Sequence, residues 1–122
     1  MGRVHRGRRA RQRRRGRRVR RGEIWSIEGI GRAIGRENRL VLIISHDALA
    51  AQAPMVTTAA LDQTGAAPET LVTVRITEPV PALVRLDTIT SVRRERLAAL
   101  AGRLSPEDQE RVDIALRTAL DL

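Results

Sequence analysis

The sequence predicts a mainly β or α+β fold, in which a small antiparallel barrel or meander is followed by a C-terminal helix. Short segments rich in β-branched and aliphatic residues are separated by turn residues, with little helical periodicity between them. One segment, residues 40–44, is apolar throughout, which is typical of a strand covered on both faces. Near the C-terminus, apolar residues recur at helical spacing.

The predicted strands span residues 23–28, 40–44, 55–61, 70–76 and 82–92. A short helical turn over residues 48–52, capped by Asp47, is expected after the second strand. Residues 94–100 are expected to form a short helix that Gly102 ends. The last helix has the clearest signal: Ser105 as N-cap, Pro106 at the first position and Asp108 completing a capping-box pattern. Its predicted apolar stripe comprises Val112, Ala115, Leu116, Ala119 and Leu120.

The charges divide the chain at about residue 21. Residues 1–21 hold twelve arginines and no acidic residue, whereas the remaining 101 residues hold eleven arginines and fourteen Asp and Glu. We therefore expect a disordered Arg-rich tail over residues 1–21 and one small domain over residues 22–122. Such a tail can bind nucleic acid through phosphates or can be merely solvated, and the sequence leaves both open.

The composition disfavours several classes of protein. There is no cysteine, so disulfides and thiolate metal sites are absent, as expected of a protein in a reducing cytoplasm. No apolar run is long enough to span a membrane, and no secretory signal is present. His46 is the only histidine of the body, which leaves a Ser–His–Asp triad little support. No carboxylate cluster marks a metal site, and we expect no cofactor.

Arg39 is the first candidate for chemistry, because it opens the central apolar strand. A guanidinium fixed at the mouth of a buried strand is well placed to hold a phosphate. Taken alone, the residue favours the simpler interpretation of a solvated strand end, and a role in chemistry needs a second observation. The glycine-rich segment 29–38 runs directly into it and is expected to be a mobile loop. That segment lacks the ending of a nucleotide-binding loop.

From Arg21 onward the chain resembles the MazF/PemK family of bacterial toxin endoribonucleases. The matching segments are residues 21–25 (RGEIW), 39–47 (RLVLIISHD), 55–58 (MVTT), 84–89 (VRLDTI) and 102–108 (GRLSPED). Two features depart from the family pattern. Leu40 replaces the proline that commonly follows the arginine, and the loop before it is shortened to residues 35–38.

The resemblance implies an SH3-like barrel, the MazF/CcdB-like toxin fold, acting as a cytoplasmic homodimer in a type II toxin–antitoxin system. Single-stranded RNA would be cut without metal by its own 2′-hydroxyl. The RNA would be mRNA, with tRNA or rRNA as alternatives, and an acidic antitoxin would be the protein partner. By the same resemblance Arg39 stabilises the phosphorane and Thr57 hydrogen-bonds a phosphate oxygen. The remaining expected RNA-binding residues are Arg36, Glu37, Asn38 and Thr58.

Two points, the catalytic threonine and the function, stay open at this level. The register of the MVTT segment does not decide between Thr57 and Thr58, and we prefer Thr57 because it directly follows the apolar Val56. Two other functions remain: a toxin of the same fold that binds a protein such as gyrase, or a basic RNA-binding protein without catalysis. For the dimer contact we expect residues 84–89 and the last helix, where Ile114 lies off the core stripe.

Overall fold

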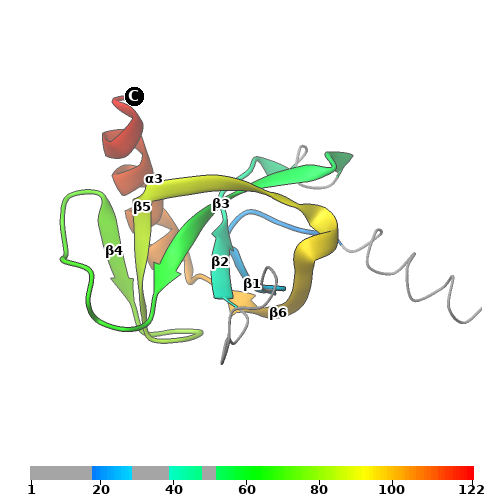
Figure 1. The fold of residues 1–122 in the computed structure, drawn as a ribbon. Coiled ribbons are helices and arrows are strands. Elements are labelled where there is room, and N and C mark those ends of the chain that lie inside the picture. Colours follow the sequence, from blue (N-terminus) through cyan, green and yellow to red (C-terminus); the bar gives the residue numbers. More distant parts are fainter. Residues whose placement is uncertain (1–17, 29–38, 48–51) are drawn as a thin grey trace, which may run out of the picture.

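The computed structural model describes residues 18–28, 39–47 and 52–122. These residues form a single antiparallel sheet and a C-terminal helix, α3 (Pro106–Leu120) (Figure 1). The strands are β1 (Glu23–Ile27), β2 (Arg39–Ile43), β3 (Met55–Asp62), β4 (Thr73–Ile76), β5 (Ala82–Arg93) and β6 (Leu97–Arg103). The predicted fold class, mainly β with a C-terminal helix, is confirmed.

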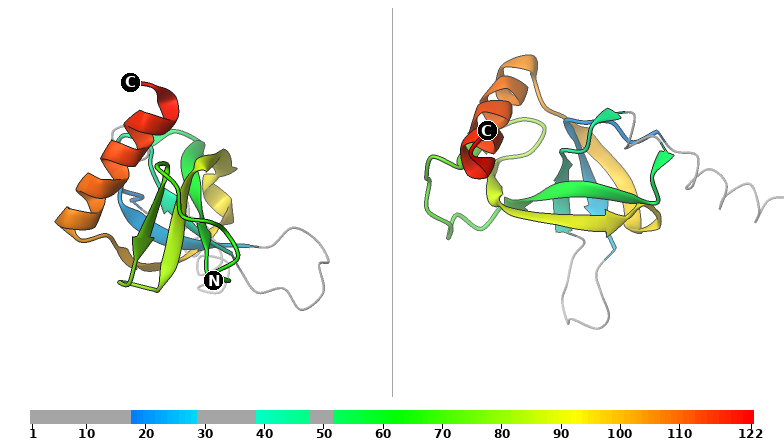
Figure 2. Two further views of the ribbon diagram at one scale, coloured as in Figure 1. Left: turned by 90° about the vertical axis from the view of Figure 1, so that its left-hand side faces the viewer. Right: turned by 90° about the horizontal axis from the view of Figure 1, so that it is seen from above.

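The strand order in the sheet is β4-β5-β3-β2-β1-β6. The long strand β5 bends through a 3₁₀ turn, η1 (Arg94–Arg96), into β6, which returns beside β1 (Figure 1). The sheet is therefore strongly curled, but β4 and β6 are its two edges and do not pair with each other. Helix α3 lies across one face of this curled sheet, where it contacts β4 and β5 (Figure 2).

Alternating side chains of the strands build two apolar clusters, one on each face of the sheet. In β2, Leu42 belongs to the cluster that contains Val112 and Ala115 of α3. Val41 and Ile43 belong to a second cluster with Trp25. This cluster lies on the concave side of the curled sheet, which we call the inside of the curl. The predicted two-sided burial of this segment is thus confirmed, and the core consists of aliphatic residues with one aromatic side chain.

Helix α3 begins as its sequence predicts. The Ser105 Oγ accepts a hydrogen bond from the Asp108 backbone N–H at 3.1 Å, and Pro106 occupies the first turn. Val112 and Ala115 are buried, and Leu116 and Ala119 are half-buried against the same cluster. Leu120 is 52% exposed, so all of the predicted apolar stripe except its last residue packs on the sheet.

Residues 94–100 do not form the predicted helix. Only Arg94–Arg96 form a helical turn, and Leu97 to Leu100 lie in β6, where they pair with β1. The segment is alanine- and leucine-rich, so its local propensity is helical, but the free edge of β1 offers a ladder of hydrogen bonds that overrides it. Gly102 lies within β6 at φ +154° and ends no helix.

Two further predicted elements are a strand that is shorter than expected and a helical turn that lies largely outside the described residues. The strand predicted over residues 70–76 is present only as β4, because Thr70 and Thr73 form a tight turn in which the Thr73 Oγ1 accepts from the Thr70 N–H at 2.7 Å. The helical turn expected over residues 48–52 lies outside the described residues, apart from Gln52.

The described body begins before residue 22. Val19 is 2% exposed and packs in the cluster inside the curl. The Arg20 backbone N–H donates to the buried carboxylate of Glu23 at 2.8 Å, and the Gly22 N–H donates to the Ile43 carbonyl oxygen at 2.9 Å. Residues that the composition assigns to the tail therefore contribute to the folded part.

Candidate functional site

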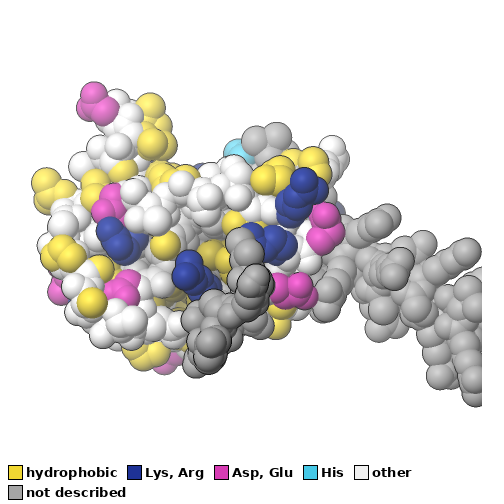
Figure 3. Space-filling view, in the orientation of Figure 1, with side chains coloured by type: hydrophobic (Ala, Val, Ile, Leu, Met, Phe, Trp, Pro, Cys, Tyr) yellow, Lys and Arg dark blue, Asp and Glu magenta, His cyan; other side chains and the backbone are white. Residues whose placement is uncertain are grey.

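A pocket of about 570 Å³ opens where the end of β3 and the turn after it face β2 and β5. Its apolar floor includes Ile27, Val41 and Ala60. Its polar lining comprises Arg39, Thr58, Asp62, Gln63, Thr64, Arg85, Thr88 and Thr90. Arginines and acidic side chains are interspersed across this side of the molecule (Figure 3). The pocket thus combines two guanidinium groups with a wall of threonines.

Arg39 is exposed at the first position of β2, as the sequence predicts. The register of β2 with β3 pairs Val41 with Ala60 and Ile43 with Thr58. Residues directly opposite in an antiparallel pair share a face, and alternate residues of a strand share it too. Arg39 therefore lies on the face that carries Thr58 and Ala60, inside the curl.

Thr57 lies on the opposite face of β3, because it is adjacent to Thr58 in the strand. Its backbone N–H donates to the Ser45 Oγ at 2.5 Å, its carbonyl oxygen accepts from the Ile44 N–H at 2.9 Å, and it is not part of the pocket lining. The structure brings Arg39 into one pocket with Thr58 and not with Thr57.

Thr58 is fully buried, and its Oγ1 donates to the Thr90 carbonyl oxygen at 3.1 Å. This hydrogen bond ties β3 to β5 at the floor of the pocket. Thr90 is exposed, lines the same pocket, and has no side-chain hydrogen bond within the described part of the chain. Its hydroxyl is therefore available to a ligand. The other three expected RNA-binding residues, Arg36, Glu37 and Asn38, lie outside the described residues.

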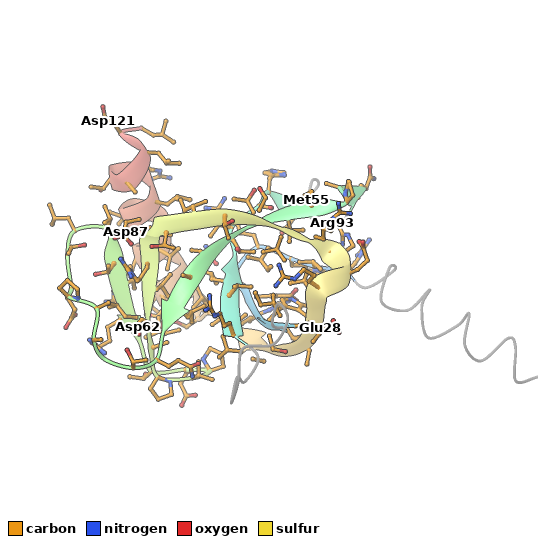
Figure 4. The ribbon with its side chains drawn as sticks, in the orientation of Figure 1. Glu28, Met55, Asp62, Asp87, Arg93 and Asp121 are labelled. Carbon is orange, nitrogen blue, oxygen red and sulfur yellow. The ribbon has the colours of Figure 1, made fainter. Side chains whose placement is uncertain are left out.

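Asp62, at the end of β3 (Figure 4), was not identified from the sequence. Its carboxylate accepts hydrogen bonds from the Thr64 Oγ1 at 2.6 Å, the Thr64 N–H at 3.1 Å and the Ala67 N–H at 3.0 Å. The hydrogen bond from the Thr64 side chain is the main reason that the pKa of Asp62 lies below its ordinary value. Asp62 thus remains ionised and fixes the turn that borders the pocket.

Arg85, on β5, was also missed. Its Nε and Nη2 donate to the two carboxylate oxygens of Asp87 at 3.2 and 3.1 Å. These hydrogen bonds lower the pKa of Asp87 and raise that of Arg85. A signal was present in the sequence, because Arg85 is the only charged residue in the otherwise apolar run 82–86.

An irregularity in the pairing of β3 with β5 shapes this side of the pocket. Ala59 pairs with Ile89, whereas the next residue, Ala60, pairs with Arg85, so residues 86–88 of β5 have no partner in β3. Side chains three residues apart in a regular strand point to opposite faces, yet Arg85 and Thr88 both line the pocket. The bulge redirects these side chains, as bulges near binding sites commonly do.

The chemistry available here is that of cationic and neutral hydrogen-bond donors. Guanidinium groups bind phosphates in a bidentate manner, and hydroxyl groups supply neutral donors beside them. Among the described residues, no group of three or more His, Cys, Asp and Glu side chains is placed to hold a metal ion. No helix in the same part of the chain is long and apolar enough to cross a membrane.

Solved structures from a Mycobacterial species and from Deinococcus radiodurans have a similar fold. An endoribonuclease from a Mycobacterial species matches with a TM-score of 0.74 and 21% identity, covering 87% of this chain and 94% of that one. A Mycobacterial endoribonuclease in complex with its cognate antitoxin gives 0.73 and 23%, covering 85% and 96%. A MazE–MazF complex from Deinococcus radiodurans gives 0.68 and 18%, covering 87% and 98%.

A search of curated protein sequences gave no significant match. A family model does match, over residues 20–120, which is most of the chain, and its description is PemK-like, MazF-like toxin of type II toxin–antitoxin system. The fold, the arginine at the mouth of β2 and this match agree. The chain belongs to the PemK-like, MazF-like family of toxins of type II toxin–antitoxin systems, a family of endoribonuclease toxins.

Proposed function

We propose that this chain cleaves single-stranded RNA in the bacterial cytoplasm by a reaction that needs no metal ion. The observation that carries the proposal is the position of Arg39, exposed at the mouth of a buried strand and facing a pocket walled by threonines. A rigid strand holds the guanidinium in place before the substrate binds, which is the condition for electrostatic catalysis.

In the proposed reaction the 2′-hydroxyl of the substrate attacks the adjacent phosphorus. The O2′ proton passes to water as the bond from O2′ to phosphorus forms, the bond from phosphorus to O5′ breaks, and the 5′-oxygen takes up a proton from water. The products are a 2′,3′-cyclic phosphate and a 5′-hydroxyl. Arg39 stabilises the negative charge that develops on the phosphorane oxygens. Because a guanidinium stays protonated, Arg39 cannot be the general base.

The neutral donor to the phosphate is Thr90 in this proposal, in place of Thr57. The Thr90 hydroxyl is free within the described part of the chain and lies in the pocket with Arg39. Thr58 fixes the backbone of Thr90, because its hydroxyl donates a hydrogen bond to the Thr90 carbonyl oxygen. The loop residues Arg36, Glu37 and Asn38 precede Arg39 directly in the sequence and would contact the RNA chain on either side of the cut.

The proposed protein partners are a second copy of this chain and a cognate antitoxin. The solved complexes of a Mycobacterial relative and of the Deinococcus radiodurans relative with antitoxins support the second of these. An acidic antitoxin segment would compete with RNA for the guanidinium groups of the pocket, because carboxylates and phosphates bind arginine in the same geometry.

The test is cleavage of a long RNA by the full chain in the presence of EDTA. We expect fragments that carry 2′,3′-cyclic phosphate and 5′-hydroxyl ends. Arg39→Ala should lower kcat by about 100-fold or more, since it removes a charge-assisted contact made in the transition state. Arg75→Ala is the matched control, because Arg75 is an exposed arginine outside the pocket. Cleavage that requires added magnesium, or an equal loss in both variants, would refute the proposal.

A further inference from the structure

The pocket contains a second guanidinium that the proposed reaction leaves unused. We propose that Arg85 binds the RNA phosphate next to the scissile one, and that Asp87 and the β5 bulge hold its guanidinium for this purpose. The inference rests on the proposed cleavage of RNA and deepens it, because it assigns a binding site for the substrate chain on the far wall of the pocket from Arg39.

The two arginines reach the pocket from different strands. Arg85 pairs with Ala60 of β3, and Ala60 pairs with Val41 of β2, two residues beyond Arg39. Neighbouring strands lie about 4.8 Å apart, so the two backbones are separated by about 10 Å across the sheet and by about 7 Å along it. Guanidiniums that approach from such separate points are suited to two successive phosphates of one RNA strand.

The guanidinium of Arg85 is oriented by the protein itself. Asp87 engages Nε and Nη2, and Nη1 has no hydrogen-bond partner among the described residues. A bidentate carboxylate therefore fixes the plane of the group and leaves donors on its other edge for a ligand. Since the guanidinium is held before the RNA arrives, little side-chain entropy is lost on binding.

The surroundings distinguish Arg85 from the exposed arginines that also have a carboxylate partner. Arg75 pairs with Glu69, Arg103 with Glu23 and Arg111 with Asp108, all outside the pocket. Arg85 instead adjoins the bulge that turns Thr88 into the same pocket. Asp62, the carboxylate of the pocket lining, is engaged by the Thr64 hydroxyl and by two backbone N–H groups. Its charge contributes to the raised pKa of Arg85, but no hydrogen bond joins the two side chains in the described part of the chain, and the free edge of the guanidinium stays open to a phosphate.

The first experiment compares Arg85→Gln with Arg75→Gln in the full chain, using an RNA oligonucleotide that contains one mapped cleavage site. Arg85→Gln should raise KM by about 10-fold and change kcat by less than about 3-fold, because the contact is present before and during the reaction. Affinity should also depend less on salt in Arg85→Gln: the slope of log affinity against log salt should correspond to about one phosphate contact fewer. Arg75→Gln should change none of these values.

A second measurement separates binding from any effect on folding. The phosphates flanking the cut are replaced one at a time by a neutral methylphosphonate, and Kd is measured by fluorescence anisotropy with the attacking 2′-hydroxyl blocked by methylation. At one flanking position the wild-type chain should lose about 10-fold in affinity, while Arg85→Gln, already lacking the contact, should lose less than about 2-fold. A misfolded variant would instead bind every oligonucleotide weakly.

Each outcome decides a different question. Equal behaviour of Arg85→Gln and Arg75→Gln, with an active wild-type chain, overturns the inference and leaves the proposed cleavage standing. A fall in kcat without a rise in KM overturns the assignment to a neighbouring phosphate. A wild-type chain that neither cuts nor binds RNA refutes the proposed function itself and the inference with it.

Discussion

The Nη2 of Arg21 donates to the Asp113 Oδ1 at 2.6 Å, joining the start of the described body to helix α3. The Arg21 backbone N–H also donates to the Asp47 carboxylate at 2.7 Å. Together with the burial of Val19, these contacts show that the residues just before β1 tie helix α3 and the segment after β2 to the sheet. The Arg-rich composition of the segment conceals this structural role.

Val19→Ala should therefore destabilise the protein, although the residue lies in a run of arginines. Removing two buried methyl groups from the cluster inside the curl should lower the free energy of unfolding by about 2 kcal/mol. Urea denaturation followed by tryptophan fluorescence measures the change, because Trp25 lies in the same cluster. Leu71→Ala is the control, because Leu71 is 84% exposed. An unchanged midpoint for Val19→Ala would contradict the observed packing.

Gly102→Ala should also destabilise the protein. Gly102 has φ +154°, and a Cβ at this position would come within 2.5 Å of the Pro79 Cβ. An alanine would have to adopt a disfavoured backbone conformation and displace the proline, at a cost of about 1–3 kcal/mol. Gly65→Ala provides the comparison, because Gly65 has φ +80° but no atom within 4 Å of its Cβ position. Thermal melts should show the larger loss for Gly102→Ala.

The strands that the sequence predicted correctly are those in which apolar and β-branched residues cluster between turn residues. Strand β6 could not be found in this way, because its residues favour a helix and become a strand only by pairing with β1. Similarly, the cap of α3 was predictable because Ser105, Pro106 and Asp108 act within one turn. Local signals therefore predicted local structure, and long-range pairing decided the remainder.

The site was predictable only in part, for the same reason. Arg39 could be identified because it opens a buried strand. The choice between Thr57 and Thr58 could not be made from the sequence. Their side chains point to opposite faces of the sheet, and the register with β2 decides which of them faces Arg39. Arg85 comes to the pocket through the pairing of β5 with β3 and the bulge beside it, which no local pattern encodes.

Thr90→Val should reduce cleavage more than Thr57→Val. The Thr90 hydroxyl lines the pocket and is free among the described residues, whereas Thr57 lies on the other face of β3. Loss of one hydrogen bond to a charged phosphate costs about 1.5–3 kcal/mol, or about 10- to 100-fold in rate. Single-turnover cleavage measures it. A larger effect of Thr57→Val would restore the assignment that the sequence favoured.

The Asp62 carboxylate should make stability depend on pH in acid. Its pKa in the folded protein lies below the ordinary value of 3.8, chiefly because of the hydrogen bond from the Thr64 side chain. A lowered folded pKa stabilises the fold above the unfolded pKa, and this contribution disappears as the pH falls through the folded pKa. Asp62→Asn should therefore lower the urea midpoint at pH 7, and the difference from the wild-type chain should shrink as the pH falls through the folded pKa. Thr64→Val should produce a smaller loss of the same sign.

The surface proposed for the dimer contact, residues 84–89 and α3, can now be narrowed, because part of it is buried in the core of the single chain. Val84 and Leu86 are at most 1% exposed and belong to the core of a single chain. The next five residues of β5, from Asp87 to Ser91, are all exposed. Ile89 and Ile114 are 36% and 54% exposed on β5 and α3, two elements that contact each other. These two side chains remain candidates for burial between subunits.

Ile114→Asp should shift the protein from dimer to monomer. A charge placed in an apolar contact between two copies must be desolvated without a partner, and around a two-fold axis the penalty occurs twice. Sedimentation velocity at micromolar concentration measures the change. Leu100→Asp, on β6, is the matched control, because Leu100 is similarly exposed at 51%. A wild-type chain that sediments as a monomer contradicts the dimer itself. A dimer that persists in Ile114→Asp would place the contact elsewhere.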